Sequence, residues 1–168
     1  GWHQVTNSSA NANIANVLSN TKGLNVISPT WFYLKDTNGG IGSLASSDYV
    51  NYCHKNNIEV WALVSNFGAK DQGLESPINN LISAAIQYKL DGINVDFESL
   101  DPSIGDSYIQ FIRELSLKCA NNGIVLSVDN YPPTAYTAFY NRSEQAVFAD
   151  YVILMGYDEH YAGSEEAG

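Results

Sequence analysis

Polar side chains that could transfer protons alternate with apolar ones in residues 90–99, which read Leu-Asp-Gly-Ile-Asn-Val-Asp-Phe-Glu-Ser. Because successive side chains of a strand point to opposite faces, Asn94, Asp96 and Glu98 would share one face and the apolar residues between them the other. At about 3.3 Å per residue, Asp96 and Glu98 would lie roughly 7 Å apart along the strand. A protonated carboxyl beside an ionised one is a general acid with an electrostatic helper. The segment therefore predicts acid–base chemistry.

Two other interpretations of these acids are a calcium site and a solvated strand at the border of a sheet. Calcium loops also use closely spaced acids, but they need a flexible turn with a glycine in its middle, whereas here the acids alternate with Ile, Val and Phe. We therefore expect no metal site. A solvated acidic strand at the border of a sheet would show the same alternation, and only other parts of the chain can exclude it.

Strand and helix signals alternate along the whole chain, which predicts βα units and a mostly parallel sheet. Apolar runs bounded by turn residues predict six strands, at residues 2–5, 24–32 (stopping near Pro29), 59–66, 90–98, 124–129 and 150–155. Amphipathic runs with capping residues predict helices near residues 14–18, 47–56, 76–86, 101–121 and 143–148. The segment 36–40 is predicted to be a loop or hairpin turn.

Residues 91–98 resemble the Asp-Gly-x-Asp-x-Asp-x-Glu signature of glycoside hydrolase family 18, the chitinase-like enzymes. Asn94 departs from the signature, because it replaces the first acid of the inward-facing trio. Residues 155–158, Met-Gly-Tyr-Asp, are similar to the family's Met-x-Tyr-Asp segment at the end of the sixth barrel strand. Together with the Asn variant and residues 128–133, the pattern is most similar to the bacterial branch of spore-cortex-lytic and related cell-wall glycosidases.

The resemblance implies an α/β fold, the (β/α)₈ TIM barrel, of which about six βα units fit into this chain. A complete barrel typically needs about 250 residues. We therefore expect residues 1–168 to be a single catalytic-type domain, a fragment that lacks the last two barrel strands and the tryptophan that the family carries on the eighth. Open sheet edges could then pair with another chain, so self-association is a further expectation.

The same resemblance assigns roles in a retaining, substrate-assisted glycosidase mechanism. Glu98 would protonate the glycosidic oxygen and later activate water. Asp96 would accept a hydrogen bond from the substrate's N-acetyl nitrogen and stabilise the oxazolinium-like charge, and Tyr157 would bind the same acetamido group. Asp158 would contact sugar hydroxyls, and Asn94 would hydrogen-bond Asp96 and fix its orientation.

Because barrel enzymes act at the carboxyl ends of their strands, Asn130, Tyr131 and Trp31 are expected as substrate contacts at the same rim. The substrate implied is a β-1,4-linked N-acetylglucosamine-containing polymer, peptidoglycan or chitin. Family members that lose the acid become lectins, so the alternative is a non-catalytic carbohydrate-binding module of a cell-envelope protein; a purely structural barrel domain is a third reading. The presence of Glu98 favours the enzyme, although an incomplete rim could leave the fragment inactive.

Composition limits the partners and the compartment. A formal net charge of −10 argues against binding nucleic acid, because the chain lacks the basic surface that would neutralise phosphates. No apolar run approaches the roughly 20 residues of a membrane span. The eleven Tyr and three Trp suit sugar binding and a plain core equally well. The resemblance implies an extracellular, cell-wall or spore-envelope location.

The cysteines and histidines give no sign of a cofactor. Cys53 and Cys119 both fall in predicted helices and are expected to be free, partly buried thiols. His3, His54 and His160 show no spacing typical of metal ligands. We therefore expect neither metal nor cofactor.

Overall fold

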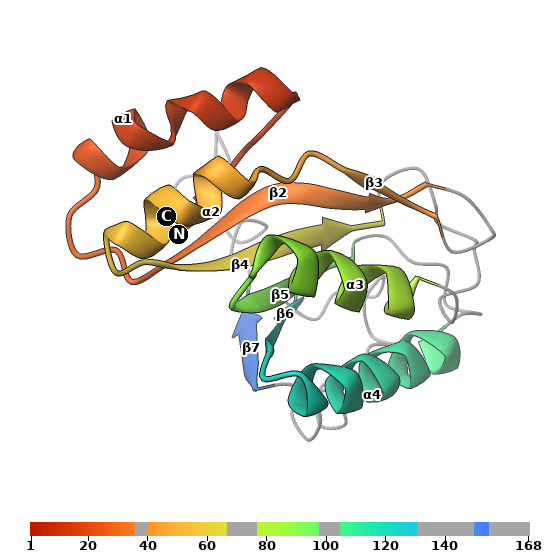
Figure 1. The fold of residues 1–168 in the computed structure, drawn as a ribbon. Coiled ribbons are helices and arrows are strands. Elements are labelled where there is room, and N and C mark those ends of the chain that lie inside the picture. Colours follow the sequence, from red (N-terminus) through yellow and green to blue (C-terminus); the bar gives the residue numbers. More distant parts are fainter. Residues whose placement is uncertain (36–39, 67–76, 98–104, 131–149, 155–168) are drawn as a thin grey trace, which may run out of the picture.

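The computed structural model describes residues 1–35, 40–66, 77–97, 105–130 and 150–154 (Figure 1). The strands in these ranges are β1 (Trp2–His3), β2 (Val26–Leu34), β3 (Ile41–Ser43), β4 (Glu59–Ser65), β5 (Gly92–Asp96), β6 (Val125–Asn130) and β7 (Tyr151–Leu154). The helices are a 3₁₀ turn η1 (Ser8–Asn13), α1 (Ile14–Ser19), α2 (Ser47–Lys55), α3 (Ile78–Tyr88) and α4 (Gly105–Asn121). The predicted alternation of strands and helices is confirmed in these ranges, and the predicted helix at 143–148 lies outside them.

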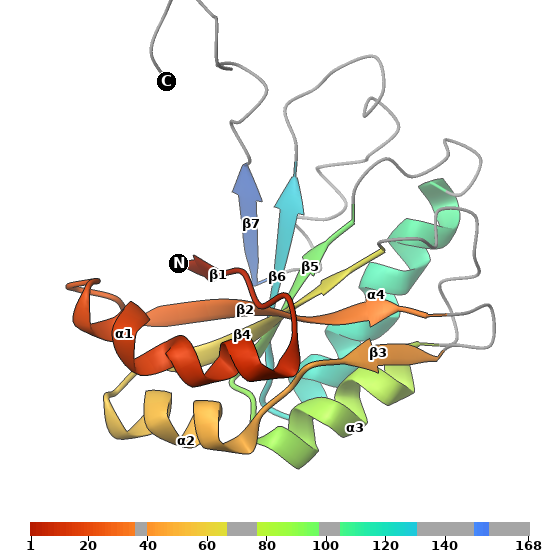
Figure 2. The same cartoon turned by 90° about the horizontal axis from the view of Figure 1, so that it is seen from above.

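The sheet has the order β1-β2-β4-β5-β6-β7, with all of these neighbours parallel. Strand β3 pairs antiparallel with β2, from Leu34 opposite Ile41, and the predicted turn between them falls mostly on residues 36–39, outside the described residues. The strand direction turns steadily from β2 to β7, and α2, α3 and α4 lie along one side of the sheet (Figure 2). The first four of these parallel strands are each followed by a helix before the next one begins, and this arrangement is that of a TIM barrel of which the described residues supply six strands.

The sheet curls far enough to bring its first and fourth parallel strands into contact. The indole N–H of Trp2, on β1, donates to Oδ1 of Asn94, on β5, at 3.3 Å. In a flat sheet three strand spacings of about 4.8 Å would separate these strands by about 14 Å. The hydrogen bond therefore crosses the concave side of the sheet and defines the inside of the partial barrel.

The strand β2 runs through Pro29 to Leu34, so the prediction that it stops near Pro29 was wrong. A proline removes one N–H donor from the ladder but keeps its carbonyl. Pro29 pairs with His3 of β1, and the pairs Ile27–Val60 and Thr30–Leu63 hold the strand on either side. One missing donor is therefore tolerated.

Helix capping and helix faces follow the sequence pattern closely. The Ser46 hydroxyl caps α2 by accepting from the Tyr49 N–H at 3.2 Å. On α3 the apolar residues Ile78, Leu81, Ile82 and Ala85 are buried, whereas Ile86 is 58% exposed. On α4 the apolar residues Ile109, Ile112 and Leu115, spaced three residues apart, are also buried.

The two cysteines are free and buried, one on α2 and one on α4. Burial raises the pKa of each thiol to about 12, and the negative charge of Asp91 beside Cys53, and of Asp150 beside Cys119, adds to the rise. Thiols with such a pKa stay protonated near neutral pH and are poor nucleophiles. Both cysteines therefore serve as small core residues.

Candidate functional site

The two faces of β5 differ as the sequence predicted. Ile93, Val95 and Phe97 point to the helices and are at most 1% exposed. Asn94 points into the barrel, toward Trp2, and Asp96 follows it on the same face. Because β4 and β6 both pair with β5, it is an interior strand. The alternative of a solvated strand at the border of a sheet is therefore excluded.

Asn94 is the centre of a buried hydrogen-bond network inside the barrel. Its side-chain Nδ2 donates to the Ser127 hydroxyl at 2.7 Å and to the Asp129 carboxylate at 2.9 Å, both on β6. Its Oδ1 accepts from Trp2 at 3.3 Å. Asn94, Ser127 and Asp129 are each at most 3% exposed. The amide thus ties β1, β5 and β6 together through one side chain.

The prediction that Asn94 hydrogen-bonds Asp96 was wrong. A primary amide carries two N–H donors, and both of those on Asn94 are used by Ser127 and Asp129. Successive inward-facing residues of one strand are two positions apart, whereas residues of the adjacent strand in register are closer. The amide therefore reaches across to β6 rather than along β5.

The inward-facing residues form layers because neighbouring strands are in register. In one layer Leu63 pairs with Asn94 and Asn94 with Ser127. In the next layer toward the carboxyl ends, Ser65 pairs with Asp96. Extending the pairing of Val95 with Val128 by one residue places Asp129 beside Asp96. Polarity therefore increases toward the carboxyl ends, where barrel enzymes hold their substrates.

The bottom layer explains the glycine of the motif. A Cβ atom on Gly92 would lie 2.7 Å from Cδ1 of Trp61 and 3.0 Å from the carbonyl oxygen of Val125. The Trp61 indole thus occupies the space that a side chain on Gly92 would need. Because Gly92 has no side chain, the Trp61 ring can fill the layer below the polar ones, nearer the amino ends of the strands.

Trp31 lies in the core of the described chain and not at the rim. It is fully buried, its indole N–H donates to Oδ1 of Asn11 at 2.8 Å, and its ring meets that of Tyr49 edge-on at 4.8 Å. Tyr49 also hydrogen-bonds and stacks on His3. Because Trp31 points to the helical layer and exposes no surface, we exclude it from the proposed substrate contacts.

Five predicted site residues lie at or after the described ends of the strands. Glu98, Tyr131, Tyr157 and Asp158 lie outside the described residues. Asn130 is the last residue of β6, and its side chain is likewise outside the description. Their roles stay a prediction, which rests on their positions at or just after the carboxyl ends of strands.

Three residues of the network were missed in the sequence: Trp2, Ser127 and Asp129. A signal for two of them was present, because Ser127-Val128-Asp129 repeats the polar-Val-Asp pattern of Asn94-Val95-Asp96. Trp2 carried no such signal, since its contact depends on the curvature of the sheet.

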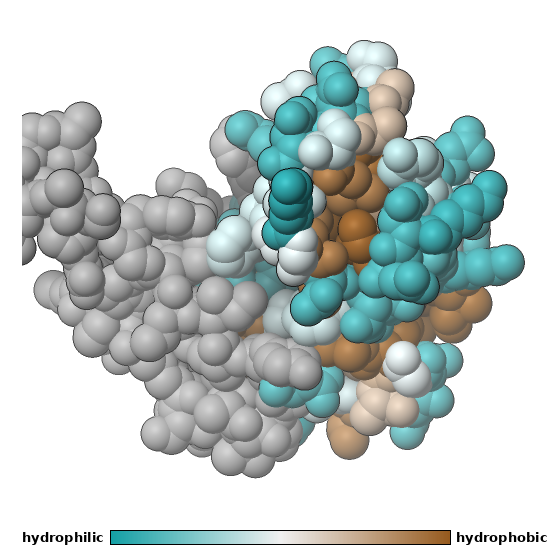
Figure 3. Space-filling view, turned by 90° about the vertical axis from the view of Figure 1, so that its left-hand side faces the viewer, coloured by the Kyte–Doolittle hydropathy of each residue, from teal (hydrophilic) through white to brown (hydrophobic). Residues whose placement is uncertain are grey.

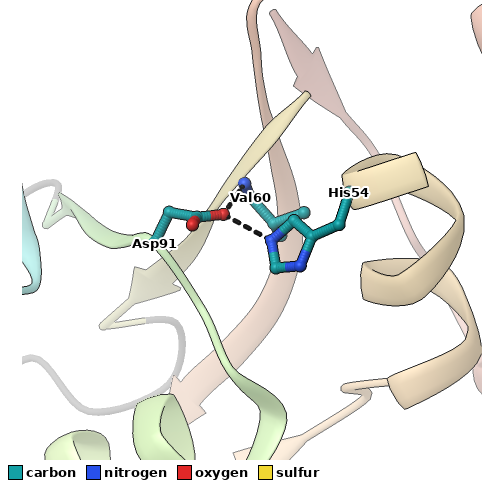
Figure 4. A network of polar contacts seen from close by, with 3 residues as sticks. All are labelled: His54, Val60 and Asp91. Atoms are coloured by element: carbon teal, nitrogen blue, oxygen red, sulfur yellow. Dashed lines mark hydrogen bonds and ion pairs between the residues drawn. The ribbon is translucent and has the colours of Figure 1, made fainter. Parts of the chain in front are cut away.

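The first aspartate of the motif belongs to a different network, at the amino ends of the strands (Figure 4). Asp91 Oδ2 accepts from the backbone N–H of Val60 at 2.8 Å and lies 2.7 Å from Nε2 of His54. These contacts join α2, β4 and the start of β5. A shallow hollow of about 330 Å³ lies beside them, lined by His54, Asn57, Ile58, Glu59 and Asp91.

The face at the start of β2 and β4 is chemically mixed. Figure 3 shows apolar side chains there that are broken up by hydrophilic ones. The described His, Cys, Asp and Glu side chains form no group of three or more that could hold a metal ion. Within the described ranges, no helix has the length and apolar character that crossing a membrane requires.

Comparison with known proteins relates the chain to glycosidases. No family model matches the sequence. The chain is 26% identical over 147 residues to an uncharacterized glycosylase of Bacillus subtilis, YvbX, covering 74% of this chain and 42% of that protein. This chain thus spans less than half of the length of the curated relatives that it matches.

The fold matches solved chitinase and cortex-lytic structures. A class V chitinase from Pseudomonas fluorescens superposes with a TM-score of 0.81 at 16% identity, covering 99% of this chain and 56% of that one. The spore cortex-lytic enzyme SleL of Bacillus cereus gives a TM-score of 0.79 at 18% identity, covering 99% of this chain and 42% of that one. At such identities the match establishes the fold, and that fold is the barrel predicted from the sequence.

Proposed function

We propose that this chain, which resembles the chitinase-like, spore-cortex-lytic glycosidases and has a TIM-barrel fold, is the catalytic domain of a glycoside hydrolase. The observation that carries the proposal is the position of Asp96. It ends the interior strand β5, on the inner face of the barrel, and Glu98 follows two residues later. An acid at the carboxyl end of a barrel strand stands where such folds perform their chemistry.

In the proposed reaction Glu98 is the general acid and then the general base. It donates a proton to the glycosidic oxygen as the bond to the anomeric carbon breaks. The carbonyl oxygen of the substrate's own acetamido group attacks that carbon and closes an oxazolinium ring, so no enzyme carboxylate bonds to the sugar. Water then opens the ring after Glu98 takes its proton, which restores the enzyme and gives a product with retained configuration.

Asp96 and the predicted rim residues orient the substrate in this scheme. The carboxylate of Asp96 accepts the hydrogen bond of the acetamido N–H and offsets the positive charge of the oxazolinium ring. Tyr157 donates to the acetamido oxygen, and Asp158, Asn130 and Tyr131 contact sugar hydroxyls and rings. Asn94 acts indirectly in the proposal, by holding β6 against β5.

The substrate class is proposed to be a β-1,4-linked polymer that contains N-acetylglucosamine. The mechanism itself requires a 2-acetamido group on the sugar whose bond is cleaved. The names of the similar proteins, a chitinase and a spore cortex-lytic enzyme, support chitin or peptidoglycan. Both polymers lie outside the cytoplasm, so the protein is proposed to act in the spore envelope, in the cell wall or outside the cell.

The test is Glu98→Gln in the full-length protein that contains this chain. Gln keeps the shape of the side chain but has no proton to give, so we expect kcat on a chitooligosaccharide or muropeptide to fall by about 10²–10⁴-fold. The matched control is Glu59→Gln, at the exposed amino end of β4, which should keep full activity. Full hydrolysis by Glu98→Gln would overturn the proposal. Wild-type protein that binds the glycan without cleaving it would instead identify a carbohydrate-binding module.

A further inference from the structure

Tyr33, near the carboxyl end of β2, is an exposed aromatic side chain that none of the roles above uses. It is 40% exposed, about as much as Tyr52, which lies on α2 at the helical side of the sheet and is 38% exposed. Trp2 is exposed too, but it pairs with Ser28 nearer the amino end of β2, and its indole is held by Asn94. In the described part of the chain, Tyr33 is therefore the exposed aromatic ring at the carboxyl ends of the strands.

Strand pairing places Tyr33 in the same layer as Asp96. Tyr33 pairs with Ser65 of β4, and Ser65 pairs with Asp96 of β5. Residues paired in register point to the same face, so the Tyr33 side chain lies on the inner face of the sheet. Two strand spacings of about 4.8 Å put it roughly 10 Å from Asp96, and less where the sheet curls. An aromatic ring thus occupies the inner rim position on β2 for which the sequence had favoured Trp31.

The ring of Tyr33 lies flat on Gly42, its partner on the antiparallel strand β3. A Cβ atom built on Gly42 would overlap Cζ and both Cε atoms of Tyr33, equally far from the two Cε atoms and only slightly nearer to Cζ. Such a point stands above the face of the ring and not beyond its edge. One face of the ring therefore rests on the β3 backbone. Because the side chain is still 40% exposed, the other face is open on the inner side of the sheet.

This stacking supports the strand and also leaves a surface that suits a sugar. A ring that covers a glycine on a neighbouring strand stabilises the pairing. It is also fixed in orientation before any ligand arrives, so binding costs little side-chain entropy. The sugars of an N-acetylglucosamine polymer carry C–H groups on the faces of their rings and hydroxyls at the edges. A flat, fixed aromatic ring beside polar groups matches such a face.

We propose that Tyr33, held flat by Gly42, binds a sugar of the glycan chain that neighbours the one held at Asp96, and thereby makes the site favour longer oligosaccharides. This inference rests on the proposed function, because it adds a contact to that same site. The sugar on Tyr33 keeps all of its bonds during the reaction, so its contact is the same in the bound substrate and in the transition state. Such a contact lowers KM and leaves kcat almost unchanged.

The first test compares ligands of different length. The full-length protein is titrated with thio-linked chitotetraose, which resists hydrolysis, and with N-acetylglucosamine alone, and binding is followed by NMR. Tyr33→Ala should weaken tetraose binding by about tenfold, as the truncation of an aromatic anchor does, and should leave monosaccharide binding unchanged. Tetraose binding equal to that of the wild type, or an equal loss for both ligands, would overturn the proposal.

Further variants separate sugar binding from the covering of Gly42. Tyr33→Leu keeps an apolar cover on the glycine but has no flat face, so it should fold and still bind tetraose weakly, whereas Tyr33→Phe should restore most of the affinity. In Gly42→Ala the new methyl group overlaps the ring and displaces it, so affinity should fall with Tyr33 intact. The matched control is Tyr52→Ala, which should bind as the wild type does. Wild-type affinity in Tyr33→Leu would show that the ring only covers the glycine.

Binding and hydrolysis together distinguish this inference from the proposed function. Weaker tetraose binding by Tyr33→Ala supports the binding residue even if Glu98→Gln proves fully active. Unchanged binding by Tyr33→Ala overturns it even if the hydrolase is confirmed. In an active hydrolase, Tyr33→Ala should raise KM for chitotetraose by about tenfold with kcat close to that of the wild type, and a fall in kcat alone would contradict the role assigned to Tyr33.

Discussion

The outer and inner faces of β5 are both largely buried, yet their chemistry is opposite. The outer face packs Phe97 against Phe111 and Tyr108 of α4, with ring centroids 5.3 and 5.9 Å apart. The inner face places Asn94 in a hydrogen-bond network that spans three strands. Apolar packing stabilises without direction, whereas buried polar groups must each find a partner and thereby fix geometry. In this strand, stability comes from the outer face and orientation from the inner one.

Truncation on the outer face should have the largest effect on stability. Phe97→Ala removes a ring that is 1% exposed and leaves a cavity between β5 and α4, so the free energy of unfolding should fall by about 3–5 kcal/mol. Urea denaturation followed by circular dichroism measures the change. Ile86→Ala is the control, because Ile86 is 58% exposed on α3 and should cost far less. Equal losses in the two variants would contradict the assignment of the core to this face.

Overfilling the inner face should have an intermediate effect. In Gly92→Ala the new methyl group would meet the Trp61 ring at 2.7 Å and the Val125 carbonyl at 3.0 Å, so unfolding should be easier by about 1–3 kcal/mol. Gly92→Ala combined with Trp61→Leu should lose less stability than the sum of the two single variants, since a smaller side chain gives way. Strict additivity in thermal unfolding would show that the Trp61 ring is not the obstacle.

The smallest effect on stability should come from His3, a polar residue that points to the outer side of the sheet. Burial lowers the pKa of His3 below its ordinary value of 6.5, so the unfolded chain binds this proton more readily than the folded one. Stability is therefore unaffected by His3 above about pH 6.5 and falls as the pH drops below that value, until His3 is protonated in the folded state too.

The measurement is the midpoint of thermal unfolding between pH 7.5 and 5.5. His3→Gln keeps a polar group near Tyr49 but cannot titrate, so its midpoint should fall less steeply with decreasing pH than that of the wild type. Parallel curves for the two proteins would contradict a desolvated histidine.

The alternation of strand and helix signals was sufficient to predict the parallel sheet, and the barrel followed from the resemblance of the motif on β5. Strand and helix periodicities alternate without conflict, and the motif on β5 fixes which face is polar. Trp31 was misplaced because β2 continues to Leu34 and shifts its pairing with β4 between Thr30 and Phe32. Such an irregularity changes which side chains face inward, and nothing in the composition of the strand marks it.

The inner network was only half predictable for a related reason. The alternation placed Asn94 and Asp96 inside the barrel, but the partner of Asn94 depends on the register between β5 and β6. Register follows from pairing distant segments, which the pattern within one segment does not encode. Asp129 therefore emerged only from the three-dimensional arrangement.

The hydrogen bond between Trp2 and Asn94 joins residues that are 92 positions apart. During synthesis on the ribosome, β1 leaves the tunnel long before β5, so the Trp2 indole has no acceptor until Asn94 has emerged. Closing so long a loop costs entropy that only the completed sheet recovers. Strand β1 can pair with β2 as soon as residues 28 and 29 have emerged, but its contact with β5, and with it the curvature of the sheet, must form later.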